Sequence, residues 1–284
     1  MERIVVGSEL LASGRVNRHQ LRTRFVKLHR NVYAPIGLDL TARDRAYAAW
    51  LWSGREAVLV GSSAAAMLGT KWLSPDEPAE LARSGHATPP GIIVRADVIA
   101  DDELCEVGGI PCTTAARTAY DIGRRIPRDE GIIRVDALLN ATRCGVGDVE
   151  AVAARHAGAR GIAQLRRTLA MADGGAESPR ETRLRLLLDR SLTPRLVTQI
   201  PVADDSGRVR RRIDMGYPQW MVGVEYDGEQ HFDSPRAYAN DIVRLEFLAE
   251  RGWTIVRVSS AQLRYERAEI VARVHRALVA RGWR

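Results

Sequence analysis

Three carboxylates lie close together in residues 208–228, RVRRRIDMGYPQWMVGVEYDG, where apolar and polar residues alternate on both sides of a Pro-Gln-Trp turn. The alternation predicts an antiparallel β-hairpin with one apolar face. On the other face Asp214 lies opposite Glu225, Asp227 follows beside Glu225, and two glycines leave open space. The predicted cross-strand pairs are Ile213 with Tyr226, Asp214 with Glu225, Met215 with Val224, Gly216 with Gly223, and Tyr217 with Val222.

The chemistry that suits these carboxylates is the binding of a divalent cation. Like charges directly opposite each other destabilise a sheet, so stability alone does not explain the pair. Clustered carboxylates with room above them bind hard cations, and Asp214 and Glu225 are therefore predicted to hold Mg²⁺ or Mn²⁺. Such an ion would activate water for phosphodiester hydrolysis. The alternative is that an arginine, from Arg210–Arg212 or elsewhere, neutralises the carboxylates in a salt-bridge network.

Two residues outside the hairpin could take part in the same chemistry. His231 follows the hairpin and titrates near neutral pH, which suits proton transfer; its alternative role is to hydrogen-bond a carboxylate. Glu181 stands three residues after Ser178, with proline between them, which is the pattern of a helix capping box. In that box Glu181 accepts a hydrogen bond from the Ser178 amide, so the cap explains this residue and a site role is secondary.

The C-terminal segments resemble a known bacterial family. ESPRETRLRLLL, RRIDMGYPQWMVGVEYDGEQH, the Asn240-Asp241-x-x-Arg244 helix and RGWTIVRVSSAQL resemble the uncharacterised family related to very-short-patch-repair endonucleases, within the PD-(D/E)xK nuclease superfamily. The resemblance covers about residues 177–270. It implies a restriction-endonuclease-like α/β domain.

The same resemblance implies roles for individual residues. By position, Glu181 matches the first-helix acid, Asp214 the metal-binding acid and Glu225 the acid of the second motif. Asp227 stands where the family pattern has lysine, the residue assigned to the attacking water. His231 resembles the histidine of the repair endonucleases and would take over that role.

A second group of functional candidates lies in residues 15–30, RVNRHQLRTRFVKLHR, which contain no acid. Asn17 predicts the cap of a helix that buries Leu21 and Phe25, and VKLHRNVYAP predicts a β-hairpin turning at Arg30-Asn31. With the short helix before Ser13-Gly14, this order is typical of a winged helix-turn-helix. The alternative is a solvated basic face on a small helical cap. The predicted DNA-binding residues are Arg18, Arg22, Arg24, Lys27 and Arg30.

This N-terminal segment resembles the winged-helix domain of AbiEi-type antitoxins. The resemblance rests on GRVNRHQLR and LHRNVYAP, followed by GSSAAAMLG at residues 61–69, and it covers roughly residues 1–170. It implies a second antitoxin-like unit in the middle of the chain. There, short strands and a hairpin turning at Gly108-Gly109 precede several helices. His156 stands alone in this region and is interpreted as a surface or packing residue.

Composition sets the limits for the whole chain. It has 284 residues with 45% hydrophobic and 27% charged side chains, so it can bury cores and is not disordered. The net charge of +7 is concentrated at the two ends, with +5 in residues 1–50 and +4 in residues 177–284. A polyanionic partner is therefore expected at these ends. The three cysteines form neither a disulfide framework nor a zinc set, which fits a cytoplasmic protein.

The predicted fold is a multidomain α+β and α/β chain. Residues 1–70 form a winged helix-turn-helix domain, 71–172 a mixed α/β antitoxin-like region, and 177–284 a restriction-endonuclease-like domain, after a linker at MADGGAES, 171–178. No run approaches the roughly 20 apolar residues of a membrane span, so no membrane association is expected.

Two hypotheses of function follow. The first is a DNA-directed, Mg²⁺-dependent endonuclease that a winged helix targets to DNA. The alternative is an antitoxin-type transcriptional regulator whose nuclease-like domain is catalytically degenerate, with a partner toxin and a homodimer as further expected partners. A small-molecule enzyme is disfavoured because neither a G-x-G-x-x-G nor a Walker pattern occurs.

Overall fold

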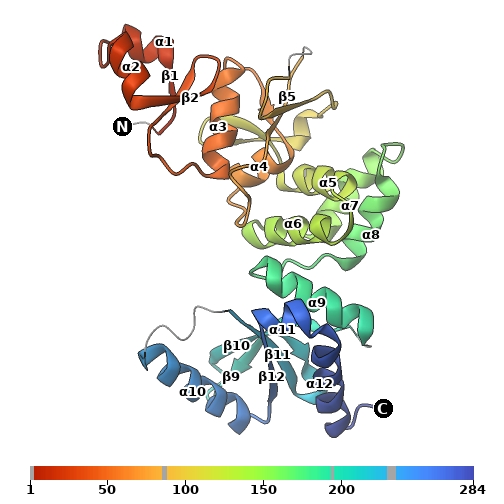
Figure 1. Cartoon of the computed structure of the whole chain (residues 1–284). Coiled ribbons are helices and arrows are strands. Elements are labelled where there is room, and N and C mark those ends of the chain that lie inside the picture. The colour runs from red at the N-terminus through yellow and green to blue at the C-terminus, as the bar shows by residue number, and fades with distance from the viewer. Residues whose placement is uncertain (1–2, 85–87, 193–194, 229–234) are drawn as a thin grey trace. The chain divides into compact units, whose positions relative to one another are not determined.

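The computed structural model describes residues 3–84, 88–192, 195–228 and 235–284. The chain folds into two compact units, Met1–Ala170 and Met171–Arg284, that combine helices with three sheets (Figure 1). The second unit begins at the first residue of the MADGGAES segment. None of the helices in the described ranges is long and apolar enough to cross a lipid bilayer.

The first unit opens with two short helices on a three-stranded antiparallel sheet of order β1-β3-β2. The two predicted helices and the predicted hairpin are confirmed, and the hairpin turns at Asn31, which has a φ of 62°. Leu21 and Phe25 are buried with Leu10 in one apolar cluster as predicted, but the helix ends at Arg24 and Phe25 is the first residue of β2. The elements are β1 Val5–Val6, α1 Gly7–Ala12, α2 Arg18–Arg24, β2 Phe25–His29 and β3 Val32–Pro35.

A five-stranded mixed sheet of order β6-β5-β4-β8-β7 follows in the same unit. The sequence pattern predicted a domain boundary at residue 70, but β4 and α4 share one buried cluster with the strands beyond that point. The physical reason is that β4 is an inner strand, which pairs with β5 on one side and β8 on the other. The elements are α3 Ala42–Trp52, β4 Val58–Leu59, α4 Gly61–Met67, β5 Ala79–Ala82, β6 Ile92–Arg95, the 3-10 turn η1 Asp101–Glu103, β7 Leu104–Val107 and β8 Ile110–Thr113.

Helices complete the first unit. The predicted turn at Gly108-Gly109 is confirmed, since both glycines have positive φ and β7 pairs with β8 across them. Thr114 caps the helix that follows, because its side chain accepts from the backbone N–H of Arg117. The helices are α5 Ala115–Arg125, α6 Arg128–Ala141, α7 Val146–Arg155 and α8 Ile162–Met171.

The second unit is a four-stranded sheet of order β12-β11-β10-β9, in which β11 and β12 are parallel. One face packs on α9 and α12 through Leu184, Met215 and Val274, and the other carries a smaller cluster with Ile213 and Leu248 of α10. The strand β9 was not predicted from the sequence. The elements are α9 Pro179–Ser191, β9 Val197–Ala203, β10 Val209–Tyr217, η2 Pro218–Trp220, β11 Val222–Asp227, α10 Pro235–Glu250, β12 Thr254–Ser259, α11 Ser260–Tyr265 and α12 Arg267–Ala280.

Candidate functional site

The helix α2 is set in place by its first and last residues. Asn17 Oδ1 accepts from the Gln20 amide at 2.8 Å and the Gln20 side chain accepts from the Asn17 amide at 2.9 Å, which is a reciprocal capping box. Burial of Leu21 turns one side of the helix inward, and Phe25, which begins β2, is buried in the same cluster. The remaining sides of α2 are therefore presented to solvent in one defined orientation.

The β2–β3 hairpin is tied to the start of α1 through Asn31. Asn31 Nδ2 donates to the Ser8 hydroxyl at 2.8 Å, and its Oδ1 accepts from the Ser8 amide at 3.0 Å. The backbone carbonyl of Asn31 accepts from the Gly7 amide at 2.8 Å. A Cβ at Gly7 would lie 2.6 Å from the Tyr33 ring, so glycine permits this close approach. The hairpin turn and the first helix thus form one rigid piece.

All five predicted DNA-binding residues lie on the surface that α2 and this hairpin form. Each is exposed, and none makes an ion pair with a carboxylate in the described part of the chain. We call this set the basic surface. It consists of Arg18, Arg22, Arg24, Lys27 and Arg30.

The predicted carboxylates of the second unit lie in a cleft of about 670 Å³. They meet there with Arg211, which the sequence analysis named as a possible partner, and with Arg244 and Arg257, which it did not name. The cleft is lined by Arg211, Asp214, Glu225, Tyr226, Asp227, Asn240, Asp241, Arg244 and Arg257.

Two arginines neutralise most of these acids. Arg244 donates to Oε2 of Glu225 at 2.7 Å, and its other terminal nitrogen lies 2.6 Å from Oε1. Arg257 lies between Asp227 and Asp241, with distances of 2.6 and 2.7 Å to their carboxylate oxygens. The salt-bridge alternative is therefore the arrangement that the structure contains, with arginines from α10 and β12 in place of Arg210–Arg212.

The backbone pairing beside Asp214 differs from the prediction. The pairs from Met215 with Val224 to Tyr217 with Val222 are confirmed, but the ladder between β10 and β11 ends there. Asp214 is not paired with Glu225; its carboxylate accepts from the Tyr226 amide at 3.0 Å. The carboxylate thus replaces a backbone acceptor at the point where the two strands separate.

The space predicted beside the two glycines of this hairpin is filled. A Cβ at Gly216 would lie 2.3 Å from the Val222 carbonyl oxygen, and one at Gly223 would lie 2.7 Å from Ile255. These glycines permit close packing of the sheet with its neighbours. They do not open room for an ion.

Glu225 is 3% exposed, and this burial raises its pKa to about 7, against the opposing effect of Arg244 and with a smaller contribution from Asp214. Burial also raises the pKa of Glu181, to which Asp214 adds. The Glu181 carboxylate accepts from the Glu177 amide at 2.9 Å and from the Ser178 hydroxyl at 2.8 Å. Glu181 thus acts at the helix start as predicted, but its backbone partner is Glu177 and not Ser178.

The carboxylates of the cleft could bind Mg²⁺ only through oxygens that no arginine already contacts. Arginines bind oxygens of Glu225, Asp227 and Asp241 that a cation would need, so these residues as placed do not fit the ion. Within the described ranges, no group of three or more His, Cys, Asp or Glu side chains has the geometry of a metal site. His231, the predicted proton-transfer residue, lies outside the described residues.

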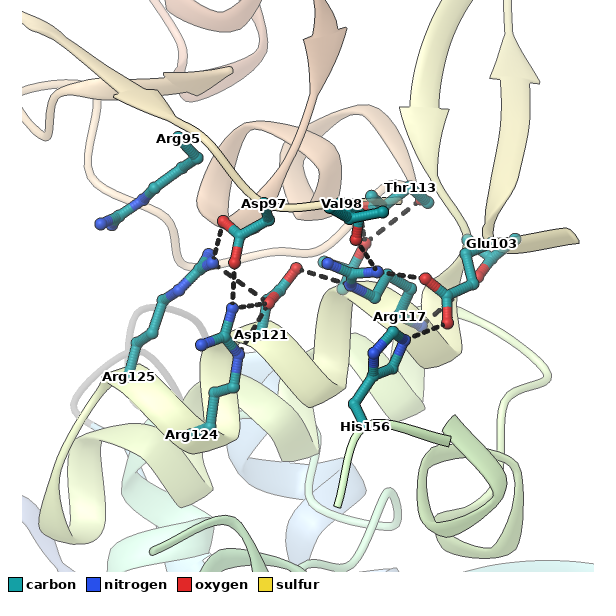
Figure 2. Close-up of polar contacts among 12 residues, drawn as sticks. Arg95, Asp97, Val98, Glu103, Thr113, Arg117, Asp121, Arg124, Arg125 and His156 are labelled. Atoms are coloured by element: carbon teal, nitrogen blue, oxygen red, sulfur yellow. Dashed lines mark hydrogen bonds and ion pairs between the residues drawn. The ribbon is translucent and has the colours of Figure 1, made fainter. Parts of the chain in front are cut away.

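A buried ionic network in the first unit was not predicted from the sequence (Figure 2). Arg117 of α5 is 2% exposed and forms ion pairs with Glu103 and Asp121, each 1% exposed. His156 Nε2 lies 2.7 Å from Glu103, so this histidine is not alone as predicted. Burial by itself would raise the pKa of Glu103, but hydrogen bonds from His156 and Arg117 lower it to about 2.

The network continues along α5. Arg124 and Arg125 both form ion pairs with Asp97 and with Asp121, so one helix is joined to the segment that follows β6 (Figure 2). The only signal in the sequence was the spacing of Arg117, Asp121 and Arg125 along one helix. It could not show that Glu103 and Asp97 would meet them.

Part of the first unit is similar to a known protein family. Residues 57–171, which contain the five-stranded sheet and the buried network, match the family described as AbiEi antitoxin C-terminal domain. This part of the chain is therefore similar to the C-terminal domain of AbiEi antitoxins.

Two curated relatives extend the comparison beyond this domain. They are the uncharacterized proteins MT2308 and Rv2248 of two Mycobacterium tuberculosis strains. Each is 30% identical over 227 residues, covering 78% of this chain and 83% of the relative. This chain belongs to the same family as these two mycobacterial proteins.

Proposed function

We propose that this protein is a DNA-binding regulator of the antitoxin type, in which residues 5–35 act as a winged helix-turn-helix. The observation that carries the proposal is the basic surface, whose five cations are exposed and form no ion pair with a described carboxylate. The arginines of the buried network, and Arg244 and Arg257 of the cleft, are neutralised within the fold, whereas these five are left for a polyanion. The match to the AbiEi antitoxin C-terminal domain supports the regulator class.

The proposed contacts follow from the positions of the cations. Arg18 and Arg22 lie one turn apart on α2, the helix that a helix-turn-helix inserts in the major groove. Guanidinium groups there can donate two parallel hydrogen bonds to a phosphate or a guanine edge. Lys27 and Arg30 lie on the hairpin, which would contact the phosphate backbone beside the groove. Arg24 lies at the junction of the two elements.

A partner toxin is part of the same proposal. The description of the matched family as an antitoxin domain supports a toxin as the partner of residues 57–171. This domain would hold the toxin on a rigid frame, because its buried ion pairs fix α5 against the segment after β6. DNA binding would then remain with the basic surface.

Replacing Arg18 and Arg22 together by alanine is expected to weaken binding to duplex DNA by at least about tenfold at low salt. The slope of log K against log salt should become shallower by about 1.8, because each neutralised phosphate contributes about 0.9. Fluorescence anisotropy with a labelled duplex over a salt series measures both quantities. Arg166→Ala with Arg167→Ala is the matched control, since both arginines are exposed on α8. Equal affinity and slope in the Arg18 and Arg22 variant would contradict the proposal.

Metal-dependent hydrolysis in the second unit is the second candidate function. The observation in its favour is the cleft, in which Asp214, Asp227 and Glu225 face one space of about 670 Å³. Against it, Arg244 and Arg257 already neutralise the acids. The regulator therefore has the stronger support.

Addition of Mg²⁺ or Mn²⁺ is expected to leave the melting temperature of the protein unchanged, because arginines hold oxygens that an ion would bind. A ligand that binds only the folded state at 100 times its Kd would stabilise it by about 2.7 kcal/mol, which a thermal melt detects readily. EDTA-treated protein is the baseline, and Asp214→Asn is the control variant. A metal-dependent rise that Asp214→Asn removes, accompanied by cleavage of DNA, would favour the nuclease.

A further inference from the structure

The distal half of the β9–β10 hairpin carries four arginines, Arg208 and Arg210–Arg212, and only Arg211 of them lines the cleft. Arg208, Arg211 and Arg212 are exposed, and none forms an ion pair with a carboxylate in the described ranges. Arg210 lies 3.7 Å from Asp204, with its side chain 54% exposed. By contrast, Arg251 is paired with Asp205 of the same hairpin turn. We call residues 203–212 the arginine ribbon.

The ribbon is a defined structure. Asp204 Oδ1 accepts from the amides of Ser206 and Arg208 at 3.0 and 3.1 Å, and Gly207 has a φ of 80° that closes the turn. Cross-strand pairs then join Arg211 to Val202 and Arg212 to Pro201. The arginines are therefore held on a two-stranded scaffold at the edge of the sheet, with a register shift between Val209 and Arg211.

The fold gains little from the ribbon itself. Val209 is 49% exposed, and the next three residues of β10 are also exposed, until Ile213 enters the core. A two-stranded ribbon without a covering layer is at best marginally stable, so this extension is not explained by burial. Protection of a sheet edge from aggregation can use charges of either sign. Arg208, Arg211 and Arg212, which have no carboxylate partner in the described ranges, are suited to an anionic ligand.

We infer that the arginine ribbon is a second binding surface for duplex DNA, separate from the basic surface of the first unit. A two-stranded antiparallel ribbon has the dimensions to enter the major groove, and arginine is the side chain best suited to phosphates and guanine edges. Arg211 also lines the cleft, so the bound duplex runs past its opening. The inference goes beyond the proposed function, because it assigns DNA binding to the second unit.

The test uses the full chain with Arg18→Ala and Arg22→Ala, so that DNA bound through the basic surface does not mask the ribbon. Binding of a fluorescently labelled duplex about two helical turns long is followed by anisotropy between about 50 and 200 mM salt. Adding Arg208→Gln, Arg211→Gln and Arg212→Gln is expected to weaken the remaining affinity at least tenfold. The salt slope should become shallower by roughly 2 to 3, at about 0.9 for each phosphate that is no longer neutralised.

A control triple separates ribbon binding from the effect of general charge. Arg264→Gln, Arg267→Gln and Arg276→Gln remove the same charge from exposed positions on α11 and α12, and should change the affinity by less than about twofold. Lysine at the three ribbon positions should preserve most of the salt slope, since lysine also binds phosphate. If the glutamine triple does not fold, the three single variants should each reduce the slope by about 0.9.

The inference is overturned if the ribbon triple binds with the affinity and slope of its parent. It is also overturned if the control triple loses as much affinity as the ribbon triple, or if only single-stranded RNA binds to the parent. The proposed function fails on a different measurement. It fails if the affinity for duplex DNA is unchanged when only Arg18 and Arg22 are replaced.

Discussion

Replacing Arg117 by methionine is expected to destabilise the first unit by about 3 kcal/mol, the lower end of the range for breaking a buried ion pair. Methionine retains much of the length of the side chain but leaves Glu103 and Asp121, each 1% exposed, without their shared cation. The destabilisation stays at the lower end because His156 still reaches Glu103 and Arg124 still reaches Asp121. For a unit of this size the melting temperature should fall by roughly 6–12 °C, as thermal melts would show.

The control for this variant is an exposed ion pair of the same unit. Arg55 pairs with Glu9 at 2.7 Å, with side chains 43% and 56% exposed, so Arg55→Met should cost less than about 1 kcal/mol. Adding Glu103→Gln and Asp121→Asn to Arg117→Met should recover part of the stability, because the stranded charges are then removed. Equal melting temperatures for the Arg117 and Arg55 variants would contradict the structural role of the network.

Glu225→Gln is expected to stabilise the second unit at pH 8 by about 2–3 kcal/mol and to have little effect near pH 4.5. The folded pKa of about 7 lies above the ordinary value of 4.5, so folding favours the protonated carboxyl. The contribution of this group to stability is therefore greatest below about pH 4.5, falls as pH rises, and reaches its lowest level above about pH 7. Each pKa unit corresponds to about 1.4 kcal/mol, which sets the size of the effect.

Denaturant melts at several pH values measure this difference, and Glu246→Gln is the matched control. Glu246 is exposed on α10, so its replacement should change the stability little at either pH. A gain for Glu225→Gln that does not depend on pH would show that packing and not ionisation is responsible. A decrease in stability at pH 8 would show that the ion pair with Arg244 outweighs the burial of the charge.

Local patterns in the sequence were sufficient for the elements that carry the basic surface. Asn17 and Gln20 stand three residues apart, which determines the cap of α2, and the apolar Leu21 and Phe25 indicate the buried residues of α2 and of the strand that follows it. The turn at Asn31 and the pairing of Met215 with Val224 are likewise local, because a short turn determines which residues face each other. These predictions depend on one helix or one hairpin at a time, and the structure contains them.

Predictions failed where the partners come from different elements. The predicted boundary at residue 70 separates β4 from the strands β5 and β8, with which it pairs. The strand β4 is too short for its sequence pattern to reveal these partners. The two glycines of the hairpin were predicted to leave open space. The sequence pattern did not reveal that β12 pairs with β11 and brings the Ile255 side chain against Gly223.

The carboxylates of the cleft show the same limit in their chemistry. Residue types and spacing predicted that Asp214, Glu225 and Asp227 would gather, but not which charges would face them. The parallel pairing of β11 with β12 brings Arg257 level with Glu225, and α10 brings Arg244 from 19 positions along the chain. Only the packing of these elements decides whether an arginine or a cation neutralises a buried acid, because the electrostatic energy depends on distances across the fold.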